Sequence, residues 1–328
     1  MKLNTVLVAL SAALSFNAYA QAPIVIKFSH VVATDTPKGQ AAERFKQLAE
    51  KATNGRVKIE VYPNSQLYKD KEELEALQLG AVQMLAPSLA KFGPLGVKEF
   101  EAFDLPYIFP SKTALYNVTE GEIGKSLLKK LEPKGITGLA FWDNGFKVMS
   151  ANKPLRSTAD FKGLKMRIQS SKVLDAQMRA LGANPQVLAF SEVYQALQTG
   201  VVDGTENPPS NMYTQKMHEV QKYVTVSNHG YLGYAVIVNK KFWDGLPADI
   251  RTALDKAMKD ATTFEKAIAQ RDNDLALEAI KKGGKTEIYT LSVKEQAEWR
   301  KVLLPVQKEM EGRIGKELIS AINKEAAK

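Results

Sequence analysis

Arg167 is the residue whose type and setting most directly suggest binding chemistry. In the run GLKMRIQS, residues 163–170, apolar and polar side chains alternate with the period of a β-strand, and Arg167 falls on the polar face. A planar guanidinium can hold a carboxylate through two parallel charge-assisted hydrogen bonds. Arg167 therefore either faces a wet cleft, where it could bind an acid, or is solvated or ion-paired on an edge strand.

Asn207 could supply a positioned amide. It precedes Pro208 and Pro209 in the loop VDGTENPP, and a proline excludes the helical conformation from the residue before it, so we expect a stiff loop. An amide side chain offers both a donor and an acceptor to a ligand. A plain turn into the helix expected at 209–218 is the alternative.

Basic and hydroxyl side chains follow two further predicted strands. Ser88 and Lys91 lie just past the end of a short strand at 82–86, which is where open α/β sheets place ligands. Lys147 lies opposite in phase to its apolar neighbours in the extended run 146–151. A surface lysine is the alternative interpretation of Lys147.

The sequence contains no catalytic signature. His30, His218 and His229 have no metal-ligand spacing, and no phosphate loop, dinucleotide fingerprint or nucleophile elbow is present. No nucleophile has a base and an orienting partner in a recognisable pattern. These observations favour a binding protein over an enzyme, with neither a cofactor nor a metal.

The amino-acid composition excludes several kinds of chemistry and of binding partner. The 328 residues carry a formal net charge of +9 and no cysteine, which excludes disulfides, thiol catalysis and cysteine metal sites. The excess charge is either a solvated basic surface or a mild attraction for small anions. Because no dense Lys/Arg cluster is interleaved with aromatic residues, we expect no nucleic-acid binding.

Residues 1–20 are expected to be a cleavable signal peptide. Lys2 precedes an apolar run, and Ala18-Tyr19-Ala20 has the small-x-small cleavage pattern. The apolar run is shorter than the about 20 residues that span a bilayer. We therefore expect an exported, periplasmic protein.

The remaining pattern predicts an α/β protein with helices between strands. A stretch free of glycine and proline, 248–282, predicts either one helix crossing two lobes or two helices with a bend near 270–274. Other strands are expected at 24–29, 57–62, 137–142, 184–190, 224–226, 235–239 and 286–289, and other helices at 37–52, 70–79, 112–131, 171–181, 192–199 and 293–322.

Several runs together resemble a known family. FSHVVATDTPKG, FWDNGFKVMSANKPL, FKGLKMRIQSS and LGANPQVLAFSEVYQALQTGVVDGTENP are similar to the solute-binding subunit of tripartite ATP-independent periplasmic (TRAP) transporters, and more narrowly to its C4-dicarboxylate-binding branch. The resemblance implies a two-lobed α/β periplasmic binding protein with mixed sheets, a long helix spanning both lobes and a ligand cleft between them. The expected lobes are 21–146 plus about 233–272, and 147–232 plus about 273–328.

The resemblance also implies roles for individual residues. Arg167 would form the main salt bridge to a substrate carboxylate, Asn207 would assist and Phe190 would pack beside the ligand. Lys147 and Lys91 match positions where other members place basic groups. Ser88 stands where the sialic-acid-binding branch has an acidic residue, which argues for a smaller and more anionic ligand.

A buried dianion would need a second cation as well as Arg167, since an unpaired buried carboxylate costs several kcal/mol. Lys147, Lys91 and Lys38 are the candidates, in that order. The other candidate ligand contacts are Trp142, Asn144, His30 and His229.

The expected function is capture without chemistry. The lobes would close on malate, succinate or fumarate, and a monomeric protein would deliver the ligand to the TRAP membrane permease. The alternatives are another organic acid (lactate, a keto acid, a sugar acid or an aromatic acid), an exported carboxylate-acting enzyme, or a sensor's ligand subunit.

Overall fold

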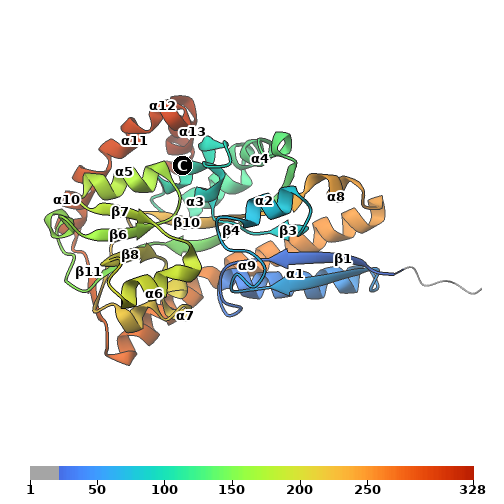
Figure 1. Cartoon of the computed structure of the whole chain (residues 1–328). Coiled ribbons are helices and arrows are strands. Elements are labelled where there is room, and N and C mark those ends of the chain that lie inside the picture. Colours follow the sequence, from blue (N-terminus) through green and yellow to red (C-terminus); the bar gives the residue numbers. More distant parts are fainter. Residues whose placement is uncertain (1–21) are drawn as a thin grey trace, which may run out of the picture.

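Two mixed β-sheets organise the chain in the computed structural model, which describes residues 22–328. The expected signal peptide, 1–20, lies outside these residues. Figure 1 shows the strands β1, β3 and β4 on one side of the molecule and β6, β7 and β8 on the other.

The first sheet has the order β2-β1-β3-β10-β4. β1 pairs in parallel with β2 and β3, whereas β10 pairs antiparallel with β3 and β4. Its strands are β1 (Ile24–Ser29), β2 (Val57–Tyr62), β3 (Met84–Leu85), β4 (Ile136–Phe146) and β10 (Tyr231–Asn239).

The second sheet has the order β11-β9-β5-β8-β6-β7. β6 pairs in parallel with β7 and β8, and β5 pairs antiparallel with β8 and β9. Its strands are β5 (Val148–Ala151), β6 (Lys165–Ile168), β7 (Asn184–Val187), β8 (Gly204–Asn207), β9 (Tyr223–Val226) and β11 (Glu287–Thr290).

Helices cover both sheets. They are α1 (Pro37–Ala52), α2 (Glu73–Gln78), α3 (Lys112–Glu120), α4 (Glu122–Lys129), α5 (Lys172–Ala180), α6 (Val193–Gln198), α7 (Pro209–Thr214), α8 (Lys240–Asp244), α9 (Ala248–Gly283), α10 (Val293–Leu303), α11 (Pro305–Glu309), α12 (Glu311–Ile314) and α13 (Lys316–Ala326). The 3-10 helices are Leu89–Phe92, Lys98–Asp104, Glu132–Lys134, Thr158–Phe161, Phe190–Glu192 and Met217–Val220.

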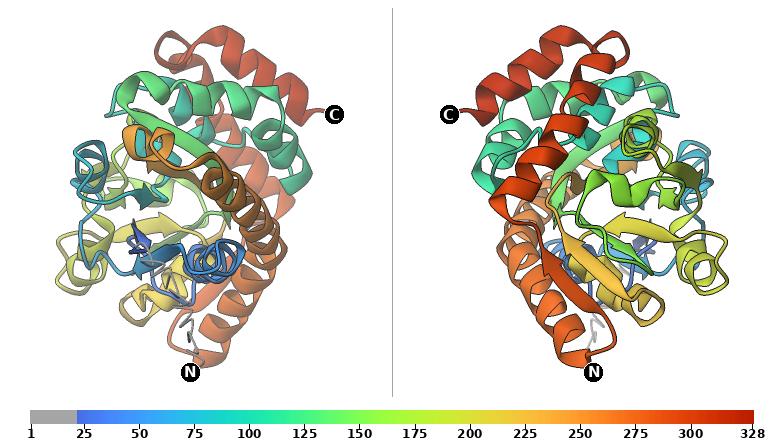
Figure 2. Two further views of the ribbon diagram at one scale, coloured as in Figure 1. Left: turned by 90° about the vertical axis from the view of Figure 1, so that its right-hand side faces the viewer. Right: turned by 90° about the vertical axis from the view of Figure 1, so that its left-hand side faces the viewer.

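Helix α9 is continuous and connects the two halves of the molecule. In its N-terminal part, Leu254 and Met258 pack with Phe28 and Val236 of the first sheet, whereas Ile280 packs with residues of the second sheet. Both views of Figure 2 show this orange helix running along one side of the molecule. Of the two arrangements expected for 248–282, the structure has the single helix.

The chain passes between the sheets at three places. β4 ends at Phe146 and β5 begins at Val148, so Lys147 lies at a crossing; the others are the loop between β9 and β10, and α9. We call the first sheet with its helices lobe I and the second sheet with its helices lobe II.

The sequence prediction assigns the C-terminal helices, up to residue 328, to lobe II. Val306, Ile314 and Ile322 pack in the core that covers one face of the first sheet, and α13 lies against α3. Figure 2 shows these red helices beside the green α3 and α4. We therefore propose that lobe II ends with α10 and that α11 to α13 belong to lobe I.

Two other segments differ from the sequence prediction. Residues 204–207, expected as a loop, form the buried strand β8 between β5 and β6. The helix expected at 112–131 is two helices, because Gly121 is extended and ends α3. The polar composition of β8 does not predict a strand, and pairing with the neighbouring strands β5 and β6 stabilises it.

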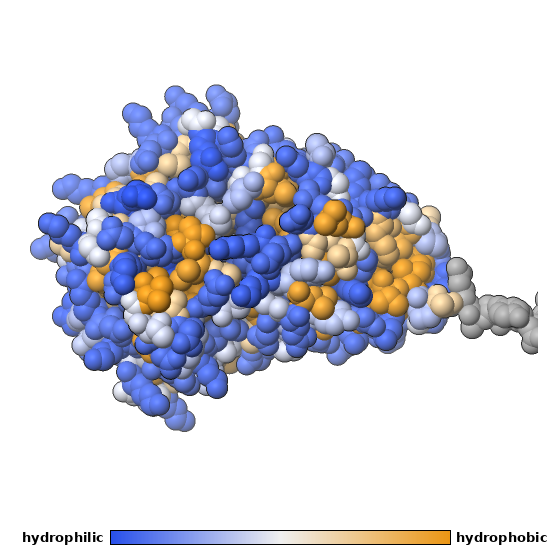
Figure 3. Space-filling view, in the orientation of Figure 1, coloured by the Kyte–Doolittle hydropathy of each residue, from blue (hydrophilic) through white to orange (hydrophobic). Residues whose placement is uncertain are grey.

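The surface on the side shown in Figure 1 is largely hydrophilic, with separate apolar patches (Figure 3). Scattered apolar side chains are normal on a folded chain. Within residues 22–328, no helix has the length and apolar character needed to cross a bilayer.

Candidate functional site

A small cavity of about 10 Å³ lies where the two sheets approach each other. This volume holds about one water molecule, so an organic acid can enter only when the lobes or the lining side chains move apart. It is lined by side chains from both lobes: Val31, Val32, Lys38, Asp70, Ser88, Lys91, Gln169, Phe190, Asn207, Asn211, Leu232 and Tyr234. Five of the candidate residues, Lys38, Ser88, Lys91, Phe190 and Asn207, are thereby brought together.

Arg167 lies beside this cavity and is 1% exposed. Its Nε and Nη2 donate to the Leu188 carbonyl at 3.1 and 2.9 Å, and its Nη2 lies 3.9 Å from Oδ2 of Asp70. The guanidinium carbon is 6.0 Å from the centre of the Phe190 ring, which lines the cavity. Within residues 22–328, Nη1 has no hydrogen-bond partner, so it can donate to a ligand.

Asn207 contributes a free donor to the cavity wall. It ends β8, and its register opposite Val148 fixes where the side chain lies. Its Oδ1 accepts a hydrogen bond from Asn211 at 3.3 Å, whereas the buried Nδ2 has no partner among the described residues. An unsatisfied buried donor costs about 1–3 kcal/mol, so the site gains from a ligand with an acceptor.

Lys91 is already paired with carboxylates. Its Nζ lies 2.6 Å from Oδ1 of Asp70 and 2.6 Å from Oε1 of Glu73. Although burial alone would lower it, these two carboxylates raise the pKa of Lys91 above its ordinary value. Lys91 therefore lines the cavity as a charged residue whose charge is largely balanced by the protein.

Lys38 also lines the cavity but has a different environment. It projects from the first turn of α1, which Thr36 caps by accepting a hydrogen bond from the Gly39 N–H. Its Nζ donates to the Ala86 carbonyl at 2.9 Å and lies 3.7 Å from the centre of the Tyr234 ring. Burial lowers the pKa of this amine to about 7.

Lys147 belongs to a separate buried ion network. Its Nζ lies 2.6 Å from Oε1 of Glu206, and Oε2 of Glu206 lies 2.9 Å from Nε2 of His229, which contacts Ser227 through Nδ1. Against the effect of burial, Lys147 and the hydrogen bond from His229 lower the pKa of Glu206 to about 2. Lys147 and His229, both expected as ligand contacts, thus have protein partners and do not line the cavity.

The remaining candidates lie around the cavity. Trp142 packs in the core and donates from Nε1 to Thr262 of α9, and Asn144 bonds Tyr234 and Ser210. His30 is fully buried, neither ring nitrogen has a partner in the described chain, and burial lowers its pKa to about 3. These three residues support the cavity walls rather than line them.

Direct hydrogen bonds join the lobes across the cavity. The Phe190 N–H of lobe II donates to Oδ2 of Asp70 in lobe I at 2.9 Å, and Nε2 of Gln169 donates to Oγ of Ser88 at 2.7 Å. Farther from the cavity, Nε2 of Gln177 donates to the Asp104 carbonyl at 2.6 Å. Because these hydrogen bonds join the two lobes directly, the lobes are closed in this structure.

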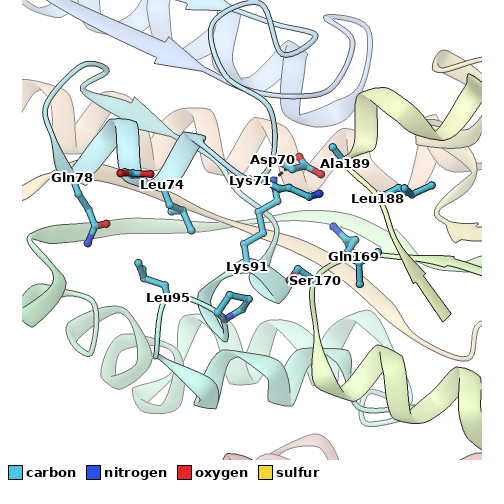
Figure 4. A pocket seen from close by; sticks show the side chains of 13 residues that line it. Asp70, Lys71, Leu74, Gln78, Lys91, Leu95, Gln169, Ser170, Leu188 and Ala189 are labelled. Carbon is cyan, nitrogen blue, oxygen red and sulfur yellow. Dashed lines mark hydrogen bonds and ion pairs between the residues drawn. The ribbon is translucent and has the colours of Figure 1, made fainter. Parts of the chain in front are cut away.

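A wider groove opens on the outer side of this closure. In Figure 4, Asp70 and Lys91 from lobe I face Gln169 and Leu188 from lobe II across it. Asp70, Lys91 and Gln169 line both the groove and the inner cavity. The groove is therefore separated from the cavity by the same polar side chains that join the lobes.

Sequence reasoning missed Asp70, Glu73, Gln169 and Tyr234. Asp70 and Glu73 occur in a charged run typical of a solvated helix face, although Glu73 is buried and Asp70 largely so, and both pair with Lys91. No spacing rule connects them to a lysine 21 and 18 residues away. The alternation in 163–170 placed Gln169 on the face of Arg167 and was the available signal for that residue.

The arrangement can bind an acid but offers no visible catalytic set. Arg167, Lys38 and the Asn207 amide can donate hydrogen bonds to anionic oxygens. Among the described residues, no group of three or more His, Asp or Glu side chains could hold a metal ion.

Comparisons with known proteins agree with this geometry. A family model described as "bacterial extracellular solute-binding protein, family 7" matches residues 28–313. The chain is 72% identical over 314 residues to the C4-dicarboxylate-binding periplasmic protein DctP of Rhodobacter capsulatus, covering 96% of this chain and 94% of that protein.

Two solved structures are similar over nearly their whole length. A TRAP periplasmic solute-binding protein of Sulfurospirillum deleyianum with bound succinate has a TM-score of 0.89 and 47% identity, covering 92% of this chain and 98% of that chain. One of Pseudomonas aeruginosa with bound L-malate has a TM-score of 0.85 and 44% identity, covering 88% of this chain and 100% of that chain.

Proposed function

The chain belongs to the bacterial extracellular solute-binding proteins of family 7, and we propose that it captures a C4-dicarboxylate and delivers it to a TRAP membrane permease. The family resemblance and the two-lobed α/β class predicted from the sequence are confirmed. Proteins of this family are substrate-binding components of transporters rather than enzymes.

The cavity between the lobes is the observation that supports this function most strongly. It combines the guanidinium of Arg167 beside it, the free Nδ2 of Asn207 and the amine of Lys38. Charge-assisted hydrogen bonds of this kind each contribute about 1.5–3 kcal/mol. Donors from both lobes suit a small ligand with acceptors at both ends, such as succinate, malate or fumarate.

The positions of these three hydrogen-bond donors explain how the ligand would be captured. Arg167 and Asn207 belong to lobe II, and Lys38 belongs to lobe I. A dicarboxylate held at both ends stabilises the closed arrangement more than the open one, and this difference is what shifts the lobes toward closure. The polar contacts of Asp70 with Phe190 and of Ser88 with Gln169 then seal the cavity.

The proposal also covers where the protein acts and which partner it meets there. The family is periplasmic, and we propose that residues 1–20 are the signal peptide that directs this chain there. We further propose that the protein acts as a monomer, with the permease recognising the closed, loaded form.

A thermal-shift screen of organic acids tests the substrate class. A ligand at 100 times its Kd adds about 2.7 kcal/mol to the free energy of unfolding. For a chain of this size we therefore expect succinate, L-malate or fumarate to raise Tm by about 4 °C. Stabilisation by lactate, keto acids, sugar acids or aromatic acids without any by C4 diacids would assign the site to another organic acid.

A further inference from the structure

We infer that Lys38 binds the second carboxylate of the ligand and takes up a proton as the ligand enters, an inference that rests on the proposed function. It changes the order of the three lysine candidates, in which Lys147 and Lys91 come first on sequence grounds.

The geometry separates the three lysines. Lys147 has a carboxylate oxygen of Glu206 at 2.6 Å, and Lys91 has carboxylate oxygens of Asp70 and Glu73 at 2.6 Å each. Lys38 has no carboxylate oxygen within 4.0 Å among the described residues. Of the two lysines that line the cavity, Lys38 is therefore the one that has no anionic partner in the protein.

The partners of Lys38 hold it in place without neutralising it. The Ala86 carbonyl accepts one hydrogen bond, and the Tyr234 ring packs against the amine in a cation–π contact. An ammonium has three N–H donors, so donors remain for a ligand oxygen. At 1% exposure the charged amine has little compensation from water, and a ligand carboxylate would supply it.

Lys38 and Arg167 also lie in different lobes. A ligand with a carboxylate at each end can engage both cations, whereas a monoacid can form an ion pair with only one. This arrangement favours a dianion over a monoanion of the same length. It also places the selective contact in lobe I, where Lys38 projects from α1 into the cavity.

Proton uptake follows from the surroundings of Lys38. In the unliganded protein, burial lowers its pKa to about 7, so the amine is mostly neutral above that pH. A carboxylate placed beside it favours the charged form and raises the pKa. The Lys38 contribution to affinity is therefore fully present below about pH 7 and declines as pH rises from there toward the pKa of the complex.

Other ionisable groups face Lys38 from the elements around it. The carboxylates Glu73, Asp70 and Glu265 favour its charged form, whereas Lys91 opposes it. The imidazole of His30 is nearby and has its pKa lowered to about 3, so it stays neutral at neutral pH. Because Glu73 is buried with a raised pKa, it is a second group that could accept a proton.

Calorimetry of succinate binding at pH 8, in two buffers of different ionisation enthalpy, measures this uptake. For the wild-type protein we expect a net uptake approaching about one proton per succinate at pH 8 and much less at pH 6. Lys38→Met should remove the uptake and weaken succinate binding about tenfold or more, the equivalent of about 1.4 kcal/mol. Uptake that persists in Lys38→Met would assign the proton to another group and overturn the inference.

Binding of a monoacid shows whether Lys38 acts by forming an ion pair or only by shaping the cavity. Succinamate has one carboxylate and one amide on the same carbon chain. Lys38→Met should lower its affinity much less than it lowers that of succinate, and an equal loss for both ligands would contradict the ion pair. Lys51→Met, which removes an exposed lysine from the end of the same helix, should leave both affinities unchanged.

The outcomes also distinguish this inference from the proposed function. If the wild-type protein binds no C4 diacid, the proposed function fails. If it binds succinate and Lys38→Met binds it equally well, only the inference fails. If Lys38→Met does not fold, Lys38→Arg provides the test: its permanently charged side chain should bind succinate without proton uptake, and uptake in this variant would contradict the inference.

Discussion

Arg167 serves both the fold and the site. Two of its N–H groups hold the Leu188 carbonyl and so fix the segment that follows β7, while Nη1 remains for a ligand. Phe190, two residues after Leu188, forms part of the cavity wall. The guanidinium thereby positions its own surroundings, which a lysine could not do with a single nitrogen.

Arg167→Lys should keep the charge but lose the fork of donors. We expect succinate affinity to fall about tenfold or more, corresponding to about 1.4 kcal/mol, by calorimetry at neutral pH. Arg179→Lys, an exposed arginine on α5 that pairs with Asp175, is the matched control and should bind like the wild type. An unchanged affinity in Arg167→Lys would limit this residue to its structural contact with Leu188.

The ion network of Lys147, Glu206 and His229 does not line the cavity, and we expect it to contribute to stability. The pKa of Glu206 is lowered from its ordinary 4.5 to about 2, so its contribution is present above about pH 4.5 and is lost as pH falls toward 2. Glu206→Gln leaves Lys147 buried without a counter-charge. We expect a loss of about 3–5 kcal/mol in the free energy of unfolding at pH 7.

Urea unfolding of both proteins between pH 7 and pH 3 measures this effect. The difference between wild type and Glu206→Gln should shrink as pH falls below about 4.5, because Glu206 takes up a proton in the unfolded wild-type chain while it stays ionised in the folded protein. Glu122→Gln, which removes an exposed ion pair with Lys125, should leave stability close to that of the wild type at every pH. A constant difference at all pH values would contradict the assigned ion pair.

At the scale of elements, local signals predicted the bounds of several helices and strands. The strands at 24–29 and 57–62 and the helix at 37–52 match the structure, since proline and the Thr36 cap mark the start of α1. The strand β8 was not predicted, because its residues, GTEN, have little strand propensity and are stabilised by pairing with β5 and β6.

The same local sequence signals predicted some residues of the site but not their partners. Arg167 follows from alternation within one strand and Asn207 from the prolines after it, whereas Gln169 was missed although it lies on the same face as Arg167. The pairing of Lys91 with Asp70 and Glu73, or of Lys147 with Glu206 59 residues away, depends on tertiary contacts that no local pattern specifies. Sequence therefore identified candidate cations but not which of them the protein had already neutralised.

Gly145 marks the junction where β4 approaches α9. Its φ of +151° is rare for residues with a side chain, and a Cβ here would lie 2.8 Å from Nδ2 of Asn273. Gly145→Ala should lower the free energy of unfolding by about 1–3 kcal/mol in urea titrations.

Gly283→Ala provides the matched control for that change. Gly283 is the last residue of α9, and a Cβ there would meet nothing within 4 Å. Alanine in a helix is favoured over glycine, so this variant should be neutral or up to about 1 kcal/mol more stable. Equal effects at both glycines would show that close packing at the β4–α9 junction is unimportant.

At the scale of the whole molecule, the two sheets act as separate supports for the two ends of one ligand. Four connections cross between the lobes, because the chain also returns from α10 to α11, and the contacts across the cavity include the polar pairs of Gln169 with Ser88 and of Phe190 with Asp70. Val31 and Val32 of lobe I also belong to one apolar cluster with Phe190 of lobe II, so hinge opening would separate apolar as well as polar contacts. The ligand completes the interface by supplying a carboxylate to Lys38, which has none within 4.0 Å, and further acceptors to Arg167, which already lies 3.9 Å from Asp70.

A crystal structure of the protein with succinate tests this account most directly. The account predicts one carboxylate within hydrogen-bond distance of Arg167 and Asn207 Nδ2, and the other beside Lys38 Nζ, with Lys147 still paired to Glu206. Succinate bound away from Arg167, or with its second carboxylate far from Lys38 and held by lobe II alone, would contradict it.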